Sequence, residues 1–552
     1  MRTASWWKAA LSELSGETSP GLMPGLFYIR PVAMLFRLCY NDAGKNIRYR
    51  EECIMIRRGR SWIIRIAAVV SALVILTPGS AFMEGVRDIM AGKDIKLIVS
   101  YKKKGENNPL YTQRFGADPG VMEYDGRLYV FMTDDIIERD TAGNVKENSY
   151  SQIRCINCIS SDDMVNWTDH GRIRVAGAGG IARGANNSWA PCAAHKTIDG
   201  QEKFFLYFCN GGNGIGVLTA DSPTGPWRDE LGKLLITRNT PNCANVTWLF
   251  DPAVMVDDDG TGYLAFGGGV PSGKQARPGT GRIVRLGEDM MSLDCDPVAL
   301  DVPYLFEDSG INKINGKYIY SYCSNWQTDG NALRLSSGAI QYMVSDNPMG
   351  PYTYVGELFP NEGKFFGMYG NNHHSIACLN GEYYLFYHNR PVEKAMKISG
   401  NYRSPQVDKI TVNEDGTMKG VIGTMRGISQ LKPFDPYREV EAATMARQAG
   451  IQVSVKDWKT WVTAKPGAWM TLSGVDFGEG AARVKVCASS ASGGTIYIAS
   501  GSLDGEVAGQ IEIPAGTEEP AEFTAELNLS GQVDVYFVFD SNIEFYSWQA
   551  ER

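Results

Sequence analysis

The sequence predicts an all-β protein in which a five-bladed β-propeller precedes a β-sandwich (jelly-roll) domain. One motif occurs five times: a leading side chain, then seven to ten positions later an Asp-Gly or Asn-Gly turn, then an aromatic-rich run. Such turns favour hairpins because both central residues of a type I′ turn need φ > 0. The copies recur about every 55 to 70 residues, which suits one four-stranded blade each. Short alternating strands after Glu439 indicate the sandwich.

The leading residue of each copy is expected to lie on the propeller axis, because the first strand of each blade lines the central channel. Three of the five carry carboxylates, and two facing carboxylates are the machinery of glycoside hydrolysis, one as acid and one as base. The alternative is that these residues only cap strand ends or make turns. The five are Asp118 before Asp125-Gly126, Trp189 before Asp199-Gly200, Asp251 before Asp259-Gly260, Glu307 before Asn315-Gly316 and His373 before Asn380-Gly381.

Domain boundaries are predicted where the pattern of expected strands and turn residues changes along the chain. The propeller is predicted over residues 96–430, with the run IKLIVSY as its first strand. Residues 431–436, which contain Pro433 and Pro436, are expected to form a linker. The sandwich should then occupy residues 437–552, the usual size for such a domain.

A segment near the N-terminus, which starts at Met55 and not at the first residue, resembles an export signal. Three arginines precede an apolar run, and Gly79-Ser80-Ala81 supplies a small-residue cleavage site, so residues 55–81 are predicted to be a signal peptide. A permanent anchor or buried helix is the alternative, although the run is too short to span a bilayer. We therefore expect translation to start at Met55, with residues 1–54 an extension that is not made. The product would be secreted or periplasmic, with no membrane span after cleavage.

Composition narrows the class of partner. The chain of 552 residues has a net charge of −8 and no basic stripe, which argues against nucleic acid. Its length suits two or three domains. Of 11 cysteines, only Cys155 and Cys158 form a CxxC pair, without the second pair that a zinc site requires. The others are expected to be buried as small apolar side chains.

Five segments in this order resemble glycoside hydrolase family 43, a family of inverting five-bladed propellers that act on arabinoxylan, xylan or arabinan. The resemblance implies that Asp118 is the general base, Glu307 the general acid, and Asp251 the carboxylate that orients the acid and raises its pKa. The segments are FGADPGVMEYDGRLYVFMTDD, SWAPCAAHK, LFDPAVMVDDDGTGYLAFGGG, LFEDSGINKINGKYIYSYCSNW and GNNHHSIACLNGEYYLFYHNR.

The same resemblance implies further site residues. His373, with His374 beside it, would help to hold a calcium ion in the channel, largely through waters; a hydrogen-bonded histidine beneath the site is the alternative. Trp189 would offer a stacking face to a sugar ring, unless it is a core residue. Arg403 would donate to substrate hydroxyls. No organic cofactor is implied.

The C-terminal segment resembles carbohydrate-binding module family 6. Two departures place its structural calcium site in doubt: Ala443 follows Glu441-Ala442 where a second glutamate is expected, and Ser547 replaces an aspartate. Thr517 to Pro520 stand where an aromatic usually clamps the sugar, so we expect little sugar binding by this domain.

The resulting hypothesis is an exported, inverting exo-hydrolase that removes α-L-arabinofuranosyl side chains from arabinoxylan in the plant cell wall. A β-xylosidase or endo-arabinanase of the same family is the first alternative, because the loops between blades decide specificity. A non-catalytic glycan-binding propeller is the alternative from another class, but it predicts loss of a carboxylate and none is lost. A retaining fructan-type propeller is a further alternative. It predicts Arg-Asp-Pro at the position where this chain has Phe250-Asp251-Pro252.

Overall fold

A computed structural model describes residues 85–552 of the chain, which belong to one compact unit. The extension over residues 1–54 and the signal peptide over 55–81 lie outside the described residues. No helix within residues 85–552 is long and apolar enough to cross a membrane.

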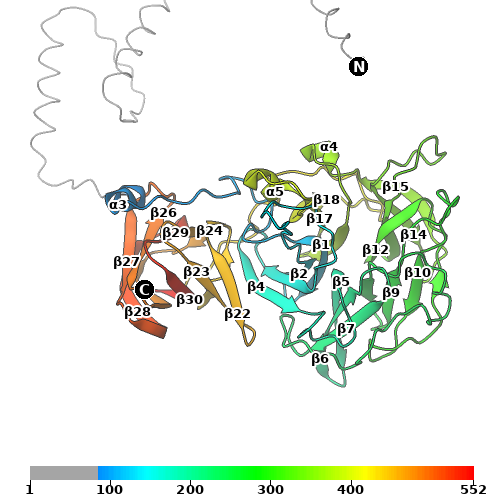
Figure 1. Ribbon diagram of the computed structural model, residues 1–552, viewed down its shortest axis with the longest axis horizontal. Coiled ribbons are helices and arrows are strands. Elements are labelled where there is room, and N and C mark those ends of the chain that lie inside the picture. The colour runs from blue at the N-terminus through cyan, green and yellow to red at the C-terminus, as the bar shows by residue number, and fades with distance from the viewer. Residues whose placement is uncertain (1–84) are drawn as a thin grey trace, which may run out of the picture. The chain divides into compact units, whose positions relative to one another are not determined.

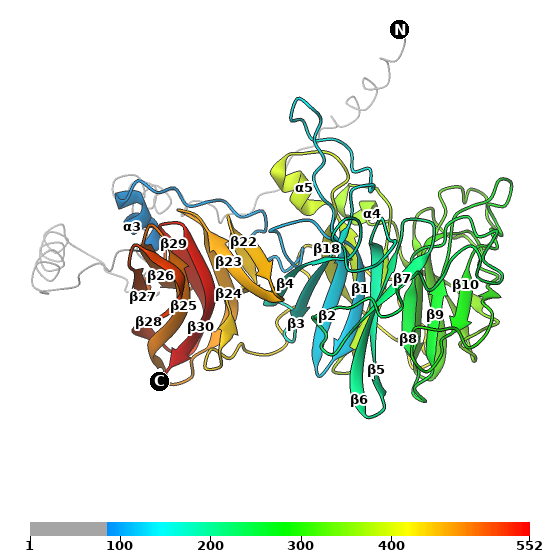
Figure 2. The ribbon, with the colours of Figure 1, turned by 60° about the horizontal axis from the view of Figure 1, so that its bottom comes forward.

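The predicted all-β fold with five blades is confirmed (Figures 1 and 2). Each blade begins with the strand nearest the axis, and neighbouring strands within a blade pair antiparallel. The blades are β1 (Ala117–Tyr124), β2 (Arg127–Thr133), β3 (Cys155–Ser161) and β4 (Trp167–Arg174); β5 (Trp189–Ile198), β6 (Gln201–Cys209) and β7 (Ile215–Ala220); β8 (Ala253–Val256), β9 (Gly262–Phe266), β10 (Arg282–Arg285) and β11 (Val298–Ala299); β12 (Leu305–Ile314), β13 (Lys317–Ser324), β14 (Ile340–Ser345) and β15 (Thr353–Phe359); β16 (His374–Leu379), β17 (Glu382–Asn389) and β18 (Ser404–Ile410).

Hydrophobic packing between neighbouring blades closes the ring. The inner strands contact one another in cyclic order, from β1 through β5, β8 and β12 to β16 and back to β1. Every adjacent pair of blades shares a buried apolar cluster, and the last of these joins Leu128 and Val130 of blade one to Leu379 and Phe386 of blade five. The axis is therefore a fixed place in the molecule, held by packing on all sides.

A short N-terminal segment fastens blade five. Asn108 is fully buried, and its side chain donates to the carbonyls of Val407 and Thr424 while accepting the Val407 N–H. The Leu110 N–H donates to the Pro405 carbonyl. These bonds serve backbone groups at the edge of β18, which has no further strand beside it. Two short helices, α4 (Gly363–Phe366) and α5 (Pro391–Met396), flank the strands of this blade.

The C-terminal domain is a sandwich of two antiparallel sheets around one core. One sheet has the order β22-β23-β30-β25-β28, with β19 against β30, and the other β21-β24-β29-β26-β27. The strands are β19 (Val440–Glu441), β21 (Arg447–Ala449), β22 (Gln452–Lys456), β23 (Lys459–Ala464), β24 (Trp469–Asp476), β25 (Ala481–Ser490), β26 (Gly494–Ser500), β27 (Val507–Ile513), β28 (Thr517–Leu529), β29 (Gln532–Phe539) and β30 (Ile543–Glu551).

The two domains share backbone pairing. Strand β20 (Thr444–Met445) pairs with β4, so that it extends the outer edge of blade one. The hairpin of β22 and β23 lies beside β4 (Figures 1 and 2). At its tip, Trp458 packs against Gly225 of blade two and remains 41% exposed. Covering the edge strand in this way protects its free backbone groups.

The run IKLIVSY is not a propeller strand, which corrects that expectation. Ile98 pairs through its backbone with Gly467, and its carbonyl accepts the indole N–H of Trp469. The preceding helix α3 (Val86–Gly92) buries Val86 and Met90 against the same face of the sandwich. The apolar run therefore covers a hydrophobic face of the sandwich. A short apolar run with this function has the same pattern as a buried strand, which explains the wrong prediction.

The linker is also part of the packed structure. Phe434 enters the sandwich core and pairs with Gly474 and Asp476 through its backbone. The nine cysteines between Cys155 and Cys487 are all unpaired, and six of them are buried. They behave as the small apolar side chains expected of them.

Candidate active site

Bulges at the start of the inner strands turn side chains into the channel. Asp118, Ala190, Asp251 and Asp308 all have positive φ, and the strand register shifts around Asp118, Ala190 and Asp308. A bulge re-aims the residues that flank it, and aspartate tolerates the left-handed region better than most residues do. In blade four the positive-φ position is Asp308, one residue after the predicted Glu307.

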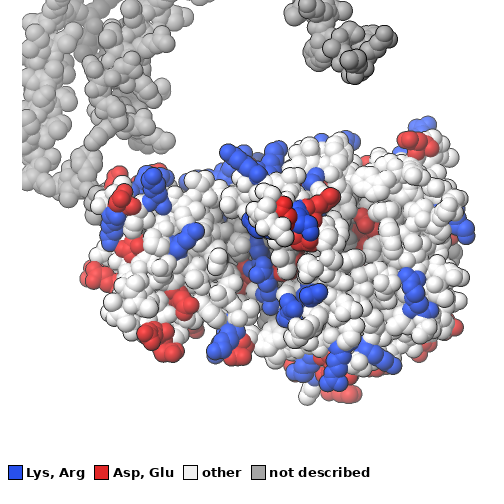
Figure 3. Space-filling model, viewed as in Figure 1, with Lys and Arg blue, Asp and Glu red and all other residues white. Residues whose placement is uncertain are grey.

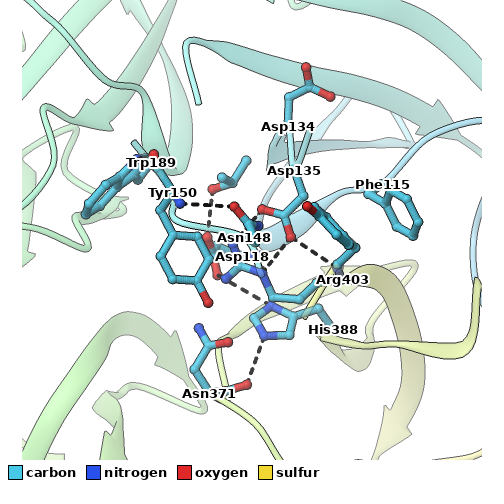
Figure 4. Close-up of polar contacts among 12 residues, drawn as sticks. Phe115, Asp118, Asp134, Asp135, Asn148, Tyr150, Trp189, Asn371, His388 and Arg403 are labelled. Atoms are coloured by element: carbon cyan, nitrogen blue, oxygen red, sulfur yellow. Dashed lines mark hydrogen bonds and ion pairs between the residues drawn. The ribbon is translucent and has the colours of Figure 1, made fainter. Parts of the chain in front are cut away.

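Asp118 is held as an anion (Figure 4). Its carboxylate accepts hydrogen bonds from Arg403 Nη1 at 2.7 Å and from the Thr133 hydroxyl at 2.7 Å. Burial acts to raise the pKa of Asp118, but the charges of Arg403 and His373 outweigh it and lower the pKa to about 2. Asp118 is therefore ionised at neutral pH, as a general base must be.

Arg403 also has a role that the sequence does not predict. Besides Asp118, it binds Asp135 through Nε and Nη2, both at 2.8 Å, and its guanidinium lies over the Tyr150 ring. The Arg403 N–H also donates to Asp135. Three of the five guanidinium N–H groups are thus bonded to two carboxylates, so Arg403 positions Asp118, and its donation to substrate hydroxyls stays a prediction. Figure 4 shows these ion pairs converging on Arg403.

His388 supports Asp118 from the backbone side. Its Nδ1 accepts the Asp118 N–H at 3.0 Å, and its Nε2 donates to the Asn371 carbonyl at 3.0 Å. Burial, followed by the charge of Arg403, lowers the pKa of His388 to about 3, so the ring is neutral. A neutral ring with its proton on Nε2 satisfies both hydrogen bonds.

Glu307 has the opposite character to Asp118. Burial first, and then the charges of Asp251 and Asp118, raise the pKa of Glu307 well above its ordinary value. Its Oε1 is buried and has no hydrogen-bond partner among the described residues. A protonated carboxyl with a free oxygen is what a general acid needs before substrate arrives. The resemblance attributes the shift to like charge, whereas burial is the larger cause here.

Asp251 acts on the backbone next to Glu307. Its Oδ2 accepts the Asp308 N–H at 2.9 Å, which fixes the chain immediately after the acid. Burial raises the pKa of Asp251 to about 7, with Asp118 adding to the shift and His373 opposing it. Asp251 is thus placed to act on the orientation of Glu307 through the main chain.

His373 lies between the carboxylates. Its Nδ1 is 3.7 Å from Asp118 Oδ1 and 3.8 Å from Asp251 Oδ2, and its Nε2 is 3.2 Å from Asp308 Oδ1. Burial alone lowers the pKa of His373, but the three acidic charges outweigh it and raise the pKa. The three acids thus favour the protonated imidazole at the axis.

His374 does not fit the predicted role of metal ligand. Its Nδ1 bonds Asp308 and its Nε2 bonds Ser321, so both ring nitrogens are engaged. No group of three or more His, Cys, Asp or Glu residues in the described part of the chain is arranged to hold a metal ion. Calcium prefers six to eight oxygen ligands, whereas of the four axial acids Asp118, Asp251, Glu307 and Asp308 only Glu307 and Asp308 each have one buried carboxylate oxygen without a hydrogen bond in the described part of the chain. These residues do not fit a calcium cage built from protein ligands.

The carboxylates open into one cavity of about 500 Å³. Trp189 lines it as predicted and donates its indole N–H to the Tyr150 carbonyl, which holds the ring in place. Aromatic side chains form much of the wall, a composition that suits sugar rings with apolar faces. The lining residues are Asp118, Tyr150, Ile153, Trp189, Ala190, Gly212, Asn213, Arg238, Thr247, Trp248, Phe250, Asp251, Glu307, Asn371, His373 and Arg403.

Sequence reasoning missed several residues of this site. Asp308 adjoins Glu307, and Asp135 follows the aromatic run of the first motif at the end of β2, so both stood close to recognised signals. His388 directly follows the aromatic run of the fifth motif, whereas Tyr150 lies in no repeated motif. Their place beside Asp118 and Arg403 arises from the packing of blades one and five.

Two carboxyls of opposite protonation, facing one aromatic cavity at the axis of a five-bladed propeller, define a glycoside hydrolase. The chain belongs to glycosyl hydrolases family 43, whose family model matches residues 106–418. Residues 441–550 match the model of carbohydrate binding module family 6, as the sequence predicts.

Named proteins are similar to this chain over most of its length. The chain is 47% identical over 464 residues to an arabinoxylan arabinofuranohydrolase of Paenibacillus polymyxa, covering 79% of this chain and 72% of that protein. It is 44% identical to one from Bacillus subtilis, covering 79% and 90%. A crystal structure of a Bacillus subtilis arabinoxylan arabinofuranohydrolase in complex with cellotetraose superposes with a TM-score of 0.80 and 42% identity, covering 83% of this chain and 99% of that one.

The first prediction concerns the charge on the base. Replacing Arg403 with methionine removes the cation that opposes burial, so the pKa of Asp118 should rise from about 2. Because the base must be ionised, lowering the pH should then abolish activity at a higher pH than in the unmodified protein. The acid limb of kcat/KM against pH measures this shift.

Arg277→Met, which breaks an exposed ion pair with Asp301, is the matched control and should leave the limb in place. The melting temperature of each variant shows whether it is folded. An unmoved acid limb in folded Arg403→Met would contradict the role assigned to Arg403.

Proposed function

We propose that the chain is an inverting exo-acting hydrolase that removes α-L-arabinofuranosyl side chains from arabinoxylan. The observation that carries the proposal is the opposite displacement of two pKa values at one cavity, low for Asp118 and high for Glu307. The names of the similar proteins from Paenibacillus polymyxa and Bacillus subtilis support the choice of substrate.

The chain's residues supply both proton transfers. Asp118 accepts a proton from water as the water oxygen attacks the anomeric carbon. Glu307 gives its proton to the glycosidic oxygen as the bond from that oxygen to the anomeric carbon breaks. The sugar leaves with inverted configuration, Asp118 is protonated and Glu307 ionised, and exchange with solvent restores both.

The surroundings assist each step. Arg403 and His373 keep Asp118 ionised, and the charge of Arg403 also favours the ionised form of Glu307 once its proton has been transferred. Asp251 holds the backbone after Glu307 so that the acid keeps its position. Trp189 and Trp248 offer aromatic surface to the bound sugar.

Substitution of the acid tests the role assignment. Glu307→Gln should lower turnover of arabinoxylan by about 10² to 10⁴-fold, because the leaving sugar oxygen needs a proton. The loss should be much smaller for aryl arabinofuranosides with good leaving groups. Asp118→Asn should instead lose activity on both substrates, since each requires the base. Near-native rates of Glu307→Gln on arabinoxylan would refute the assignment.

The same assays decide the sugar. Purified protein is offered arabinoxylan, aryl arabinofuranoside and aryl xyloside, and released sugars are identified by chromatography. Arabinose as the main product supports the proposal, whereas xylose would favour the β-xylosidase alternative.

A calcium ion at the propeller axis stays a prediction of the family resemblance. If one is held near His373 with water as most of its ligands, exhaustive chelation should lower the melting temperature or the activity. His373→Ala should then reproduce the effect, and added calcium should reverse only the effect of chelation. Unchanged melting and activity in protein shown to be metal-free would remove calcium from the account.

We also propose that the protein is exported after translation from Met55. The sequence supports this through the arginines and apolar run within residues 55–81. Sequencing the N-terminus of the protein made in its native host provides the test. A start shortly after Ala81 is expected, and a mature protein that contains Trp6 or Tyr28 would disprove it.

A further inference from the structure

A second cavity, of about 360 Å³, lies between residues 97–104 and the sandwich sheet that contains β24 and β29. Its lining differs from that of the catalytic cavity, because it holds four cationic side chains and one acid. Its charged and aromatic lining side chains include Lys102, Lys104, Arg447, Trp469, Tyr536 and Asp504. Figure 3 shows Lys and Arg side chains gathered along the upper edge of the molecule, over the stretch that leads from α3 toward β1.

Lys102 is buried there without a counter-ion. It is 2% exposed, and its ammonium donates to the Ala446 carbonyl at 3.0 Å. No carboxylate among residues 85–552 lies within the 4.0 Å that defines an ion pair with it. Burial first, and the charge of Arg447 second, lower the pKa of Lys102 to about 7. A buried ammonium of this kind is costly unless an anion joins it.

Arg447 faces the same cavity with most of its donors free. Its guanidinium lies 5.2 Å from the Trp469 ring centroid and 5.9 Å from that of Tyr536, and one nitrogen donates to the Tyr536 hydroxyl. No ion pair joins it to a carboxylate of the described chain. The stacked rings hold the planar fork in one orientation, ready to meet a planar anion.

Charge in the cavity is unbalanced. Lys104 lines it and bonds only the Gly501 carbonyl, while the single acid, Asp504, is already paired with Arg87. Arg447 and Lys104 therefore have no anionic partner among the described residues, and neither has Lys102, which a pKa of about 7 leaves partly protonated at neutral pH. A local excess of this kind attracts a negatively charged ligand.

We propose that this cavity binds a carboxylate-bearing sugar, such as a uronic acid residue attached to a polysaccharide chain. The carboxylate would pair with the Arg447 fork and the Lys102 ammonium, and the match of this domain to carbohydrate binding module family 6 favours a sugar as the group that carries it. Residues 97–104 complete the site, so it depends on a segment that lies outside the sandwich domain. This inference goes beyond arabinose removal and does not depend on it.

Calorimetry on the full chain carrying Glu307→Gln tests the site without hydrolysis. Three ligands are compared: a xylo-oligosaccharide bearing one glucuronic acid, the same oligosaccharide unsubstituted, and free acetate. We expect measurable binding of the acidic oligosaccharide and at least ten-fold weaker binding of the other two. Lys102→Met and Arg447→Met, each added to this protein, should weaken acidic-sugar binding about 10- to 100-fold, as expected for charge-assisted hydrogen bonds.

Lys103→Met is the matched control, because Lys103 adjoins Lys102 but is exposed and pairs with Glu106. It should leave binding unchanged. Equal binding of the neutral oligosaccharide would overturn the proposal, as would equal binding of acetate, which would identify a site for small anions only. No binding of the acidic oligosaccharide, or binding unaffected by folded Lys102→Met and Arg447→Met, would also overturn it.

Discussion

The site depends on how four buried acids are kept together at the propeller axis. Asp118, Asp251, Glu307 and Asp308 are each less than one-tenth exposed, and like charges so placed repel strongly at low dielectric. Nearby cations and raised pKa values reduce this repulsion. Arg403 and His373 lower the pKa of Asp118, whereas burial and the neighbouring acids raise the pKa of Glu307, with which no cation forms an ion pair among the described residues; burial also raises the pKa of Asp251 to about 7. The division into base and acid is thus a consequence of which carboxylate Arg403 reaches.

The position of Arg403 relative to Asp118 depends on how blade five packs against blade one to close the propeller. Arg403 stands just before β18 in blade five, whereas Asp118 and Asp135 belong to blade one. The apolar cluster shared by these blades fixes the distance between them, and Asn108 fastens the same edge. Packing far from the substrate therefore determines the ionisation of the base. A change in the core of this seam would act on catalysis through the pKa of Asp118.

The sequence predicts the parts of this arrangement that are local. Hairpin turns, the five blades and the leading residues Asp118, Trp189, Asp251 and Glu307 each follow from a pattern of a few residues, and all four line one cavity. What it does not predict is pairing between distant segments. The ion pairs of Arg403 follow no local pattern because its partners Asp118 and Asp135 are more than 250 positions away. His374 looked like a ligand because Asp308 and Ser321, which occupy its ring nitrogens, lie on another blade.

The run IKLIVSY shows the same limit at the level of domains. Its residues are apolar because they cover a face of the sandwich, although most of the propeller lies between the two in sequence. The chain thus leaves the sandwich surface, builds the propeller, and returns to complete the sandwich. Strand β20, which joins blade one, makes the same connection from the other side. The run IKLIVSY covers the sandwich, and β20 covers the edge of blade one. The sandwich therefore stabilises the propeller edge whether or not it binds sugar.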